Sequence, residues 1–109
     1  MNRQEYVRRL IDAYRKTPGT TGSAHRQDRR LAEQLYERQV PLAVVENALL
    51  LASARRLLRP HDAPRLDAIR SLHYFRSVID ELMQSTMSED YFLYLRRKLA
   101  GIRNMKTER

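Results

Sequence analysis

PLAVVENALLLASARRLL, residues 41–58, contains three polar side chains before its two arginines: Glu46, Asn47 and Ser53. Its apolar residues recur at helical spacing on two adjoining faces, Leu42, Val45, Leu49 and Ala52 on one and Val44, Ala48 and Leu51 on the other. A helix that is apolar most of the way round is a buried helix. Proline is favoured in the first turn of a helix, so we expect this one to begin at Pro41. The pattern predicts a buried central helix.

Four further helices are predicted around it, because apolar residues recur at helical spacing between breaks formed by glycine and proline. They cover residues 3–16, 26–38, 66–83 and 89–103. Asn2 and Ser88 are expected to cap the first and the last of them. The sequence therefore predicts an all-α fold. It is a single-domain bundle of about five helices over residues 1–103, and residues 104–109 are expected to form a frayed tail.

The apolar stripes of these helices predict how they pack. Helices 3–16, 66–83 and 89–103 each carry a stripe that suits packing on the central helix. The clearest stripe belongs to residues 66–83 and consists of Ile69, Leu72, Phe75, Val78, Ile79, Leu82 and Met83. Helix 26–38 has many charges and few apolar residues, so we expect it to lie on the surface at the periphery.

The net charge of the chain indicates which class of partner to expect. Eighteen arginines and three lysines stand against thirteen acidic residues, and the formal net charge is +8. A compact body this positive attracts polyanions, and nucleic acid is the commonest polyanion in a cell. DNA is the expected partner, with RNA as the alternative. No run of 18 apolar residues and no cysteine occur, so we expect no membrane partner and no disulfide, which fits a cytoplasmic protein.

Two groups of basic residues have the fewest acids near them in the sequence and are the candidate phosphate contacts. They are Arg55, Arg56, Arg59, Arg65 and Arg70, and Arg96, Arg97 and Lys98. Tyr74, Tyr91 and Tyr94 are candidates to stack on an unpaired base. Other basic residues are expected to form i,i+4 ion pairs on solvated helix faces. These pairs are Glu5–Arg9, Asp12–Lys16 and Arg29–Glu33.

The sequence lacks the motifs that announce catalysis. There is no Gly-x-Ser-x-Gly turn, and Gly19 and Gly22 are not followed by the Lys-Ser/Thr of a phosphate-binding loop. His25, His61 and His73 include no i,i+4 pair that could present two metal ligands on one helix face. We therefore expect a protein that is not an enzyme, with no catalytic residue, no metal and no cofactor.

A helix-turn-helix is a sharper interpretation of the middle of the chain. Leu35, Val45 and Ala48 match its spacing loosely around a turn at residues 39–41. Gln39 stands where glycine usually allows the tight turn, and the second helix would offer only Asn47 to a base edge. We therefore expect a buried packing helix after a short turn, and major-groove recognition is the alternative.

Residues 30–83 resemble a known family. They hold Leu31-Ala-Glu-Gln-Leu-Tyr-Glu-Arg, then Val40-Pro-Leu-x-Val-Val-Glu-x-Ala-Leu, then Ile69-Arg-Ser-Leu-His-Tyr-Phe-x-x-Val-Ile-Asp-Glu. The stretch looks like the small helical modules attached to replication-initiation proteins of plasmids and mobile elements. It is more distantly similar to the C-terminal helical domain of DnaD-type primosome proteins. The resemblance implies DNA-associated scaffolding on a basic surface, with a protein partner on one of the last two helices, and transfers no catalytic residue.

Two functions fit these observations. The first is a non-enzymatic nucleic-acid-binding module, associated with replication or mobile elements, that contacts the phosphate backbone. The second is a protein-interaction adaptor, or a subunit of a larger nucleoprotein assembly, that pairs with a partner helix or a second copy. Its pairing stripe would be Phe92, Leu95, Leu99 and Ile102. The plainer interpretation of that stripe is that it closes the core of the domain itself.

Overall fold

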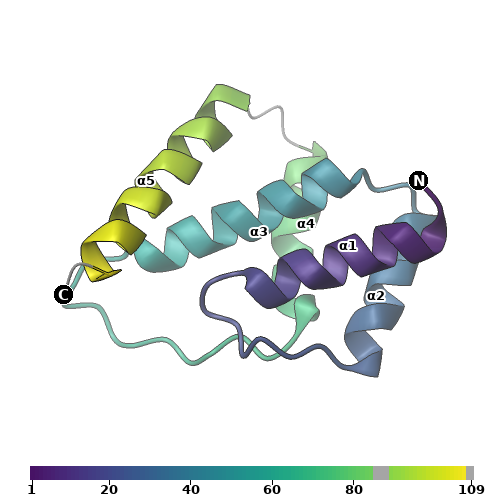
Figure 1. Cartoon of the computed structure of the whole chain (residues 1–109), viewed down its shortest axis with the longest axis horizontal. Coiled ribbons are helices and arrows are strands. Elements are labelled where there is room, and N and C mark those ends of the chain that lie inside the picture. The colour runs from purple at the N-terminus through teal and green to yellow at the C-terminus, as the bar shows by residue number, and fades with distance from the viewer. Residues whose placement is uncertain (85–88, 108–109) are drawn as a thin grey trace.

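The computed structural model describes the backbone of residues 1–84 and 89–107 and the side chains of residues 1–84 and 89–101. The fold is all-α, as the sequence predicts (Figure 1). The described residues form five α-helices and one 3-10 helix: α1 Arg3–Lys16, α2 Arg26–Glu37, α3 Leu42–Leu57, η1 Leu72–Phe75, α4 Arg76–Gln84 and α5 Glu89–Thr107. None of these helices has the length and hydropathy that crossing a bilayer requires. The predicted cap Ser88 lies outside the described residues.

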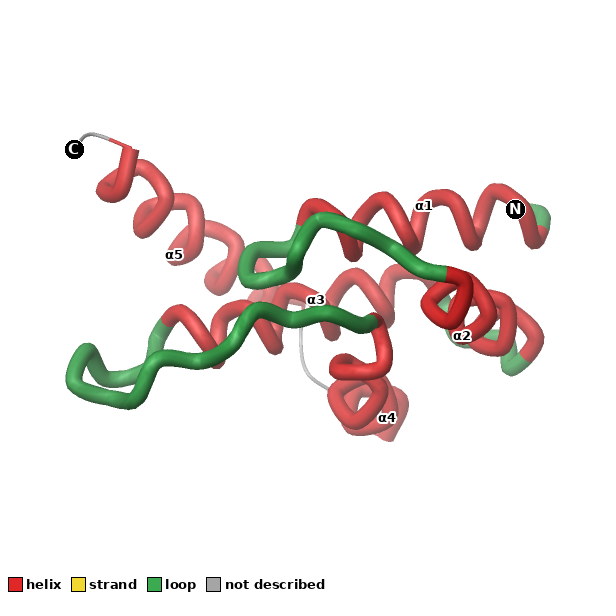
Figure 2. Tube along the Cα trace, turned by 90° about the horizontal axis from the view of Figure 1, so that it is seen from below, coloured by secondary structure: helices red, strands yellow, loops and turns green. Residues whose placement is uncertain are grey.

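The helix α3 is the central element, which confirms the prediction from residues 41–58. It runs through the middle of the molecule with α1 and α4 on opposite sides (Figures 1 and 2), and α5 packs on it as well. Pro41 precedes α3 as its N-cap rather than standing in its first turn. Ser53 is buried in α3, and its hydroxyl donates to the carbonyl of Leu49 at 2.8 Å. The remaining buried residues of α3 are Val45, Ala48, Leu49, Leu51, Ala52 and Ala54.

The helix α2 is packed more deeply than its composition predicts. It lies along α1 and η1 rather than on α3, so it is peripheral to the central helix, but its apolar face is buried. It ends in a Schellman motif, in which the N–H of Gln39 donates to Tyr36 O at 2.9 Å and the N–H of Val40 to Leu35 O at 3.0 Å. Gln39 takes the left-handed φ of 60° that this motif needs. The turn therefore forms with glutamine where glycine is usual.

The predicted helix 66–83 is wrong over residues 66–71, which are not helical. The N–H of Ile69 donates to Gly19 O at 2.7 Å, and Ile69 O accepts from the N–H of Thr21 at 3.0 Å. These bonds form an isolated parallel bridge that ties the loop after α3 to the loop after α1, side by side in Figure 2. The helix begins only at η1. Ile69 and most of the predicted stripe are still buried, whereas Met83 is 45% exposed. Tertiary hydrogen bonds have overridden the helical spacing here.

Asp28 supplies the contact that starts the helix at Leu72. Asp28 is only 1% exposed. Its carboxylate accepts hydrogen bonds from the backbone N–H groups of His25 and Leu72, both at 2.9 Å. It also accepts from the hydroxyl of Ser71 at 3.1 Å. The bond from His25 caps α2, and the other two hold the beginning of η1. One buried carboxylate therefore joins two elements that are far apart in the sequence.

The helix α5 covers part of the core by packing on α3. Its side chains Phe92, Leu95 and Leu99 are buried. This supports the plainer interpretation of the stripe for these three residues, while the side chain of Ile102 lies outside those described. The helix continues to Thr107 and so includes part of the tail predicted at residues 104–109.

Replacing Asp28 by alanine is expected to destabilise the fold strongly. Asp28→Ala removes three accepted hydrogen bonds and leaves the buried N–H of Leu72 unpaired, so the free energy of unfolding should fall by about 2–4 kcal/mol. Urea denaturation followed by circular dichroism measures this change. Glu33→Ala, which removes a half-exposed carboxylate from the same helix, is the control and should cost less than about 1 kcal/mol. Equal losses in the two variants would contradict the role given to Asp28.

Candidate nucleic-acid interface

Carboxylates neutralise only part of the positive charge. The ion pairs among the described side chains are Arg3–Glu33, Arg3–Glu37, Arg9–Glu5, Lys16–Asp12, Arg38–Asp80 and Arg55–Glu81. Two of the three predicted i,i+4 pairs are confirmed. The third, between Arg29 and Glu33, is wrong because Glu33 is turned toward Arg3 of α1. Seven of the eight predicted phosphate contacts have no ion pair with a described carboxylate: Arg56, Arg59, Arg65, Arg70, Arg96, Arg97 and Lys98.

Arg55 is the predicted phosphate contact that is neutralised. Its guanidinium donates to both carboxylate oxygens of Glu81, at 2.9 and 2.6 Å. The hydrogen bonds from Arg55 lower the pKa of Glu81, and those same bonds raise the pKa of Arg55. At neutral pH the pair carries no net charge, so Arg55 attracts a phosphate less than its neighbours do.

Arg56 is held by neutral groups, so no described carboxylate cancels its charge. Its guanidinium donates to the backbone carbonyl of Asp67 at 2.7 Å and to the hydroxyl of Tyr74 at 3.3 Å, and its carbon atom Cζ lies 5.6 Å from the centre of the Tyr74 ring. Gly19 makes room for it: a Cβ there would lie 3.2 Å from Nε of Arg56, on a backbone with φ of +93°. Arg56 therefore fastens the loop after α3 and the Tyr74 ring to α3.

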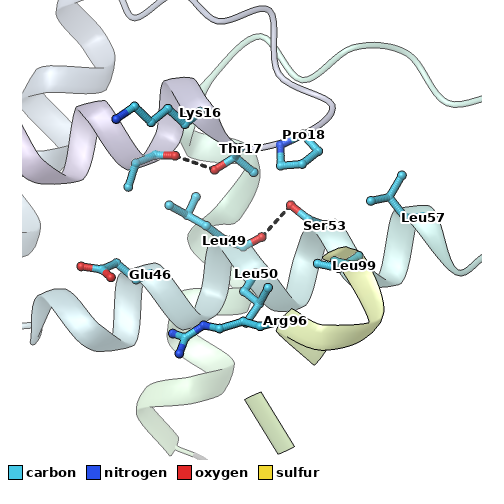
Figure 3. Close-up of a pocket in the computed structure, with 11 residues that line it drawn as sticks. Lys16, Thr17, Pro18, Glu46, Leu49, Leu50, Ser53, Leu57, Arg96 and Leu99 are labelled. Atoms are coloured by element: carbon cyan, nitrogen blue, oxygen red, sulfur yellow. Dashed lines mark hydrogen bonds between the residues drawn. The ribbon is translucent and has the colours of Figure 1, made fainter. Parts of the chain in front are cut away.

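The first of three adjoining hollows lies between the end of α1, α3 and α5 and has a volume of about 260 Å³. Figure 3 shows Lys16 of α1 and Arg96 of α5 on opposite sides of it, with leucines of α3 between them. The hydroxyls of Thr17 and Ser53 donate to backbone carbonyls at 2.7 and 2.8 Å, which leaves the floor largely apolar. Glu46 is the one carboxylate among the described residues that line it.

The other two hollows continue from the first around the C-terminal half of α3. The second, of about 340 Å³, shares Pro18 and Leu57 with the first and is lined by three arginines, Arg56, Arg59 and Arg65. The third, of about 470 Å³, lies between α3, η1 and α4. It shares Arg56, Arg59 and Leu66 with the second and adds Arg55 and Tyr74. Within the described part of the chain, no carboxylate lines the second or third hollow.

We name these three hollows together the basic trough, after the cationic residues that line it: Lys16, Arg55, Arg56, Arg59, Arg65 and Arg96. It brings together five of the eight predicted phosphate contacts and one of the three predicted stacking tyrosines. Lys16 and Leu66 belong to it without having been predicted as site residues. No local signal could have selected them, because they line it only once α1 and the loop after α3 are folded against α3.

The remaining predicted site residues lie outside the trough. Arg70, Arg97 and Lys98 are exposed and line none of its hollows. Tyr91 and Tyr94 stack on each other on α5, with ring centres 6.5 Å apart, and Lys98 Nζ donates to the hydroxyl of Tyr94 at 3.2 Å. These two tyrosines are 40% and 53% exposed.

Neither a recognition helix for the major groove nor a metal site gains support from the described residues. The first turns of α3 expose Ala43 and Glu46, and Asn47 is half-buried with its side-chain oxygen 3.5 Å from Arg96. A recognition helix normally exposes several polar and basic side chains at this end. No group of three metal-binding side chains is found within the described residues.

The Arg55–Glu81 pair gives stability a predictable dependence on pH. Because folding lowers the pKa of Glu81, the contribution of the pair is fully present above the ordinary value of 4.5 and is lost as pH falls through the lowered value. Glu81→Gln should therefore lower the urea midpoint at neutral pH, and its difference from the wild type should vanish in acid. Asp80→Asn, whose ion pair with Arg38 is longer at 3.6 Å, is the control and should have a smaller effect. A difference that grows on acidification would contradict the assignment.

Comparison with known proteins brings no relative to bear on this site: no family model matches, and no curated protein or solved structure is significantly similar to the chain. The resemblance of residues 30–83 to replication-initiation modules stays a prediction. The features that bear on function are therefore those of the chain itself, above all the line of cations around the C-terminal half of α3.

Proposed function

We propose that this protein is a non-enzymatic nucleic-acid-binding module that holds a phosphate backbone in the basic trough. The observation that carries the proposal is the meeting of basic residues from α1, α3, α5 and the loop after α3 in three adjoining hollows, with Glu46 the one carboxylate that lines them among the described residues. Side chains that bind phosphates must bring charge that no carboxylate cancels. Within the trough, this charge is carried by Arg56, Arg59, Arg65 and Arg96.

The number of such cations sets the expected strength of the salt effect. Each phosphate neutralised contributes roughly 0.7 to 0.9 to the slope of log affinity against log salt. Four contacts therefore predict that affinity falls about 100-fold between roughly 50 and 200 mM salt. A weaker dependence would mean that fewer of these arginines reach the backbone.

The finer parts of the proposal have their own support. An association with replication or mobile elements is supported by the resemblance of residues 30–83, which also favours DNA over RNA. A cytoplasmic location is part of the proposal, and a chain without cysteine, which needs no oxidising compartment, fits it. The adaptor function loses its main support, because Phe92, Leu95 and Leu99 are buried within the domain, and we do not propose it.

A double variant in the trough is expected to weaken binding and its salt dependence. Arg59→Gln with Arg65→Gln should lower the salt slope by about one for each arginine removed. Fluorescence anisotropy with a labelled DNA oligonucleotide, titrated at several salt concentrations, measures both quantities. The control is Arg26→Gln with Arg30→Gln, an equal loss of charge from exposed positions on α2 outside the trough. Equal effects of the two double variants would show that net charge, and not the trough, attracts the nucleic acid.

Glu81→Gln is expected to tighten binding. It removes the carboxylate that neutralises Arg55, so another uncancelled cation lines the third hollow and the salt slope becomes steeper. The same anisotropy titration measures the change. Asp80→Asn is the matched control, because it alters net charge equally but releases Arg38, which lies outside the trough. If the two variants tighten binding to the same extent, Arg55 has no part in the site.

A further inference from the structure

The basic trough curves around a helix. Its first hollow opens between α1 and α5, and its third lies between α3 and α4. Figures 1 and 2 place α1 and α4 on opposite sides of α3, so the two ends of the trough face different directions. An α-helix with its side chains is only about 10–12 Å across, whereas duplex DNA is stiff over about 50 nm. A duplex therefore reaches the cations of one side, and a flexible single strand can follow all three hollows.

The third hollow offers flat apolar surface beside its cations. Tyr74 is 47% exposed and Leu66 is 44% exposed, and both line this hollow together with Arg56 and Arg59. In a duplex the faces of the bases are covered by their neighbours in the stack. An unpaired base has a free face, and aromatic side chains bind such faces in proteins that hold single strands.

The ring of Tyr74 is held in place before any ligand arrives. Ser71 caps η1 by accepting from the N–H of His73 at 3.1 Å. The ring packs edge-on against the fully buried Phe75, with centres 5.2 Å apart, and its hydroxyl accepts from Arg56 at 3.3 Å. A side chain that is already ordered loses little entropy on binding. The hollow is therefore suited to a base without rearrangement.

From this geometry we infer that the basic trough takes a single strand in preference to a duplex, with one unpaired base seated against Tyr74 and Leu66 in the third hollow. The inference rests on the proposed function and adds to it the form of the nucleic acid and the position of a base. Arg59 and Arg65, which line the second hollow, hold the phosphates next to that base.

Three labelled probes test the inference by anisotropy at one salt concentration: a DNA strand of about 20 nucleotides and mixed sequence, the same sequence as RNA, and its DNA duplex. We expect at least one of the two single strands to bind about tenfold more tightly than the duplex. Tyr74→Ala should weaken binding of that strand by about tenfold or more, because it removes the stacking surface for one base. Tyr74→Phe keeps the ring and should bind within about twofold of the wild type.

Two further variants separate stacking from folding. Tyr94→Ala removes a tyrosine that is somewhat more exposed than Tyr74, at 53% against 47%, and that lies on α5 outside the trough, so affinity for the strand should not change. Leu66→Ala removes the other apolar side of the base site, and this exposed residue lies in a loop, away from the core. If Tyr74→Ala unfolds, as circular dichroism would show, Leu66→Ala carries the test.

The possible failures are distinct. If the duplex binds as tightly as both strands, or if Tyr74→Ala and Leu66→Ala bind the strand as Tyr94→Ala does, the inference is overturned. The proposed function still stands in that case, provided that the Arg59 and Arg65 double variant weakens binding. If none of the probes binds at micromolar protein, the proposed function is overturned together with the inference.

Discussion

The buried carboxylate of Asp28 is the contact on which the arrangement of this protein depends. It caps α2 and holds the N–H of Leu72 and the hydroxyl of Ser71, so it determines where η1 begins. The interior around it is tight: the ring of Tyr14 lies edge-on to Phe75 with centres 6.1 Å apart. Burial, together with the charge of Asp28, raises the pKa of the Tyr14 hydroxyl. A neutral, apolar side chain at position 28 would leave the N–H of Leu72 unpaired, and the beginning of η1 would keep only the hydrogen bonds that Ser71 accepts.

The position of η1 connects the core to the surface. Phe75 and Tyr74 are adjacent in η1, and one is fully buried while the other is half exposed in the third hollow of the trough. Arg56 then joins Tyr74 and the loop after α3 to the central helix. These contacts connect Asp28, η1 and Arg56, and through them the exposed ring of Tyr74 is held by the core.

The central helix α3 contributes apolar side chains to the core along most of its length and cationic side chains to the candidate site at its C-terminal end. Most of α3 is apolar, and its arginines are confined to the C-terminal end, where they also offset the negative end of the helix dipole. Net charge alone would not distinguish this end from the basic faces of α1 and α2. The distinction comes from the surrounding elements, which form concave surface there and line two of the three hollows without a carboxylate from the described residues.

Local patterns in the sequence were enough to predict the all-α class, the central helix, the limits of α1 and the i,i+4 pairs Arg9–Glu5 and Lys16–Asp12. Helical spacing and i,i+4 geometry act over a few residues, so they can be read directly from the chain. The non-helical backbone at residues 66–71 and the pairing of Arg55 with a carboxylate could not be predicted in this way. The first depends on hydrogen bonds from the loop after α1 to Ile69, and on the bond between Asp28 and Leu72, 44 residues apart, that starts η1. The second depends on hydrogen bonds between Arg55 and Glu81, 26 residues apart.

The same limit applies to the candidate site. Sequence identified Arg56, Arg59 and Arg65 as cations with few acids nearby, which is a property of composition. Only the tertiary structure brought Lys16, Leu66 and Tyr74 beside them, because those residues reach the trough through the packing of α1, η1 and a long loop on α3. Charge is a sum over the chain and can be counted from the sequence, whereas a concave surface exists only where separate elements meet.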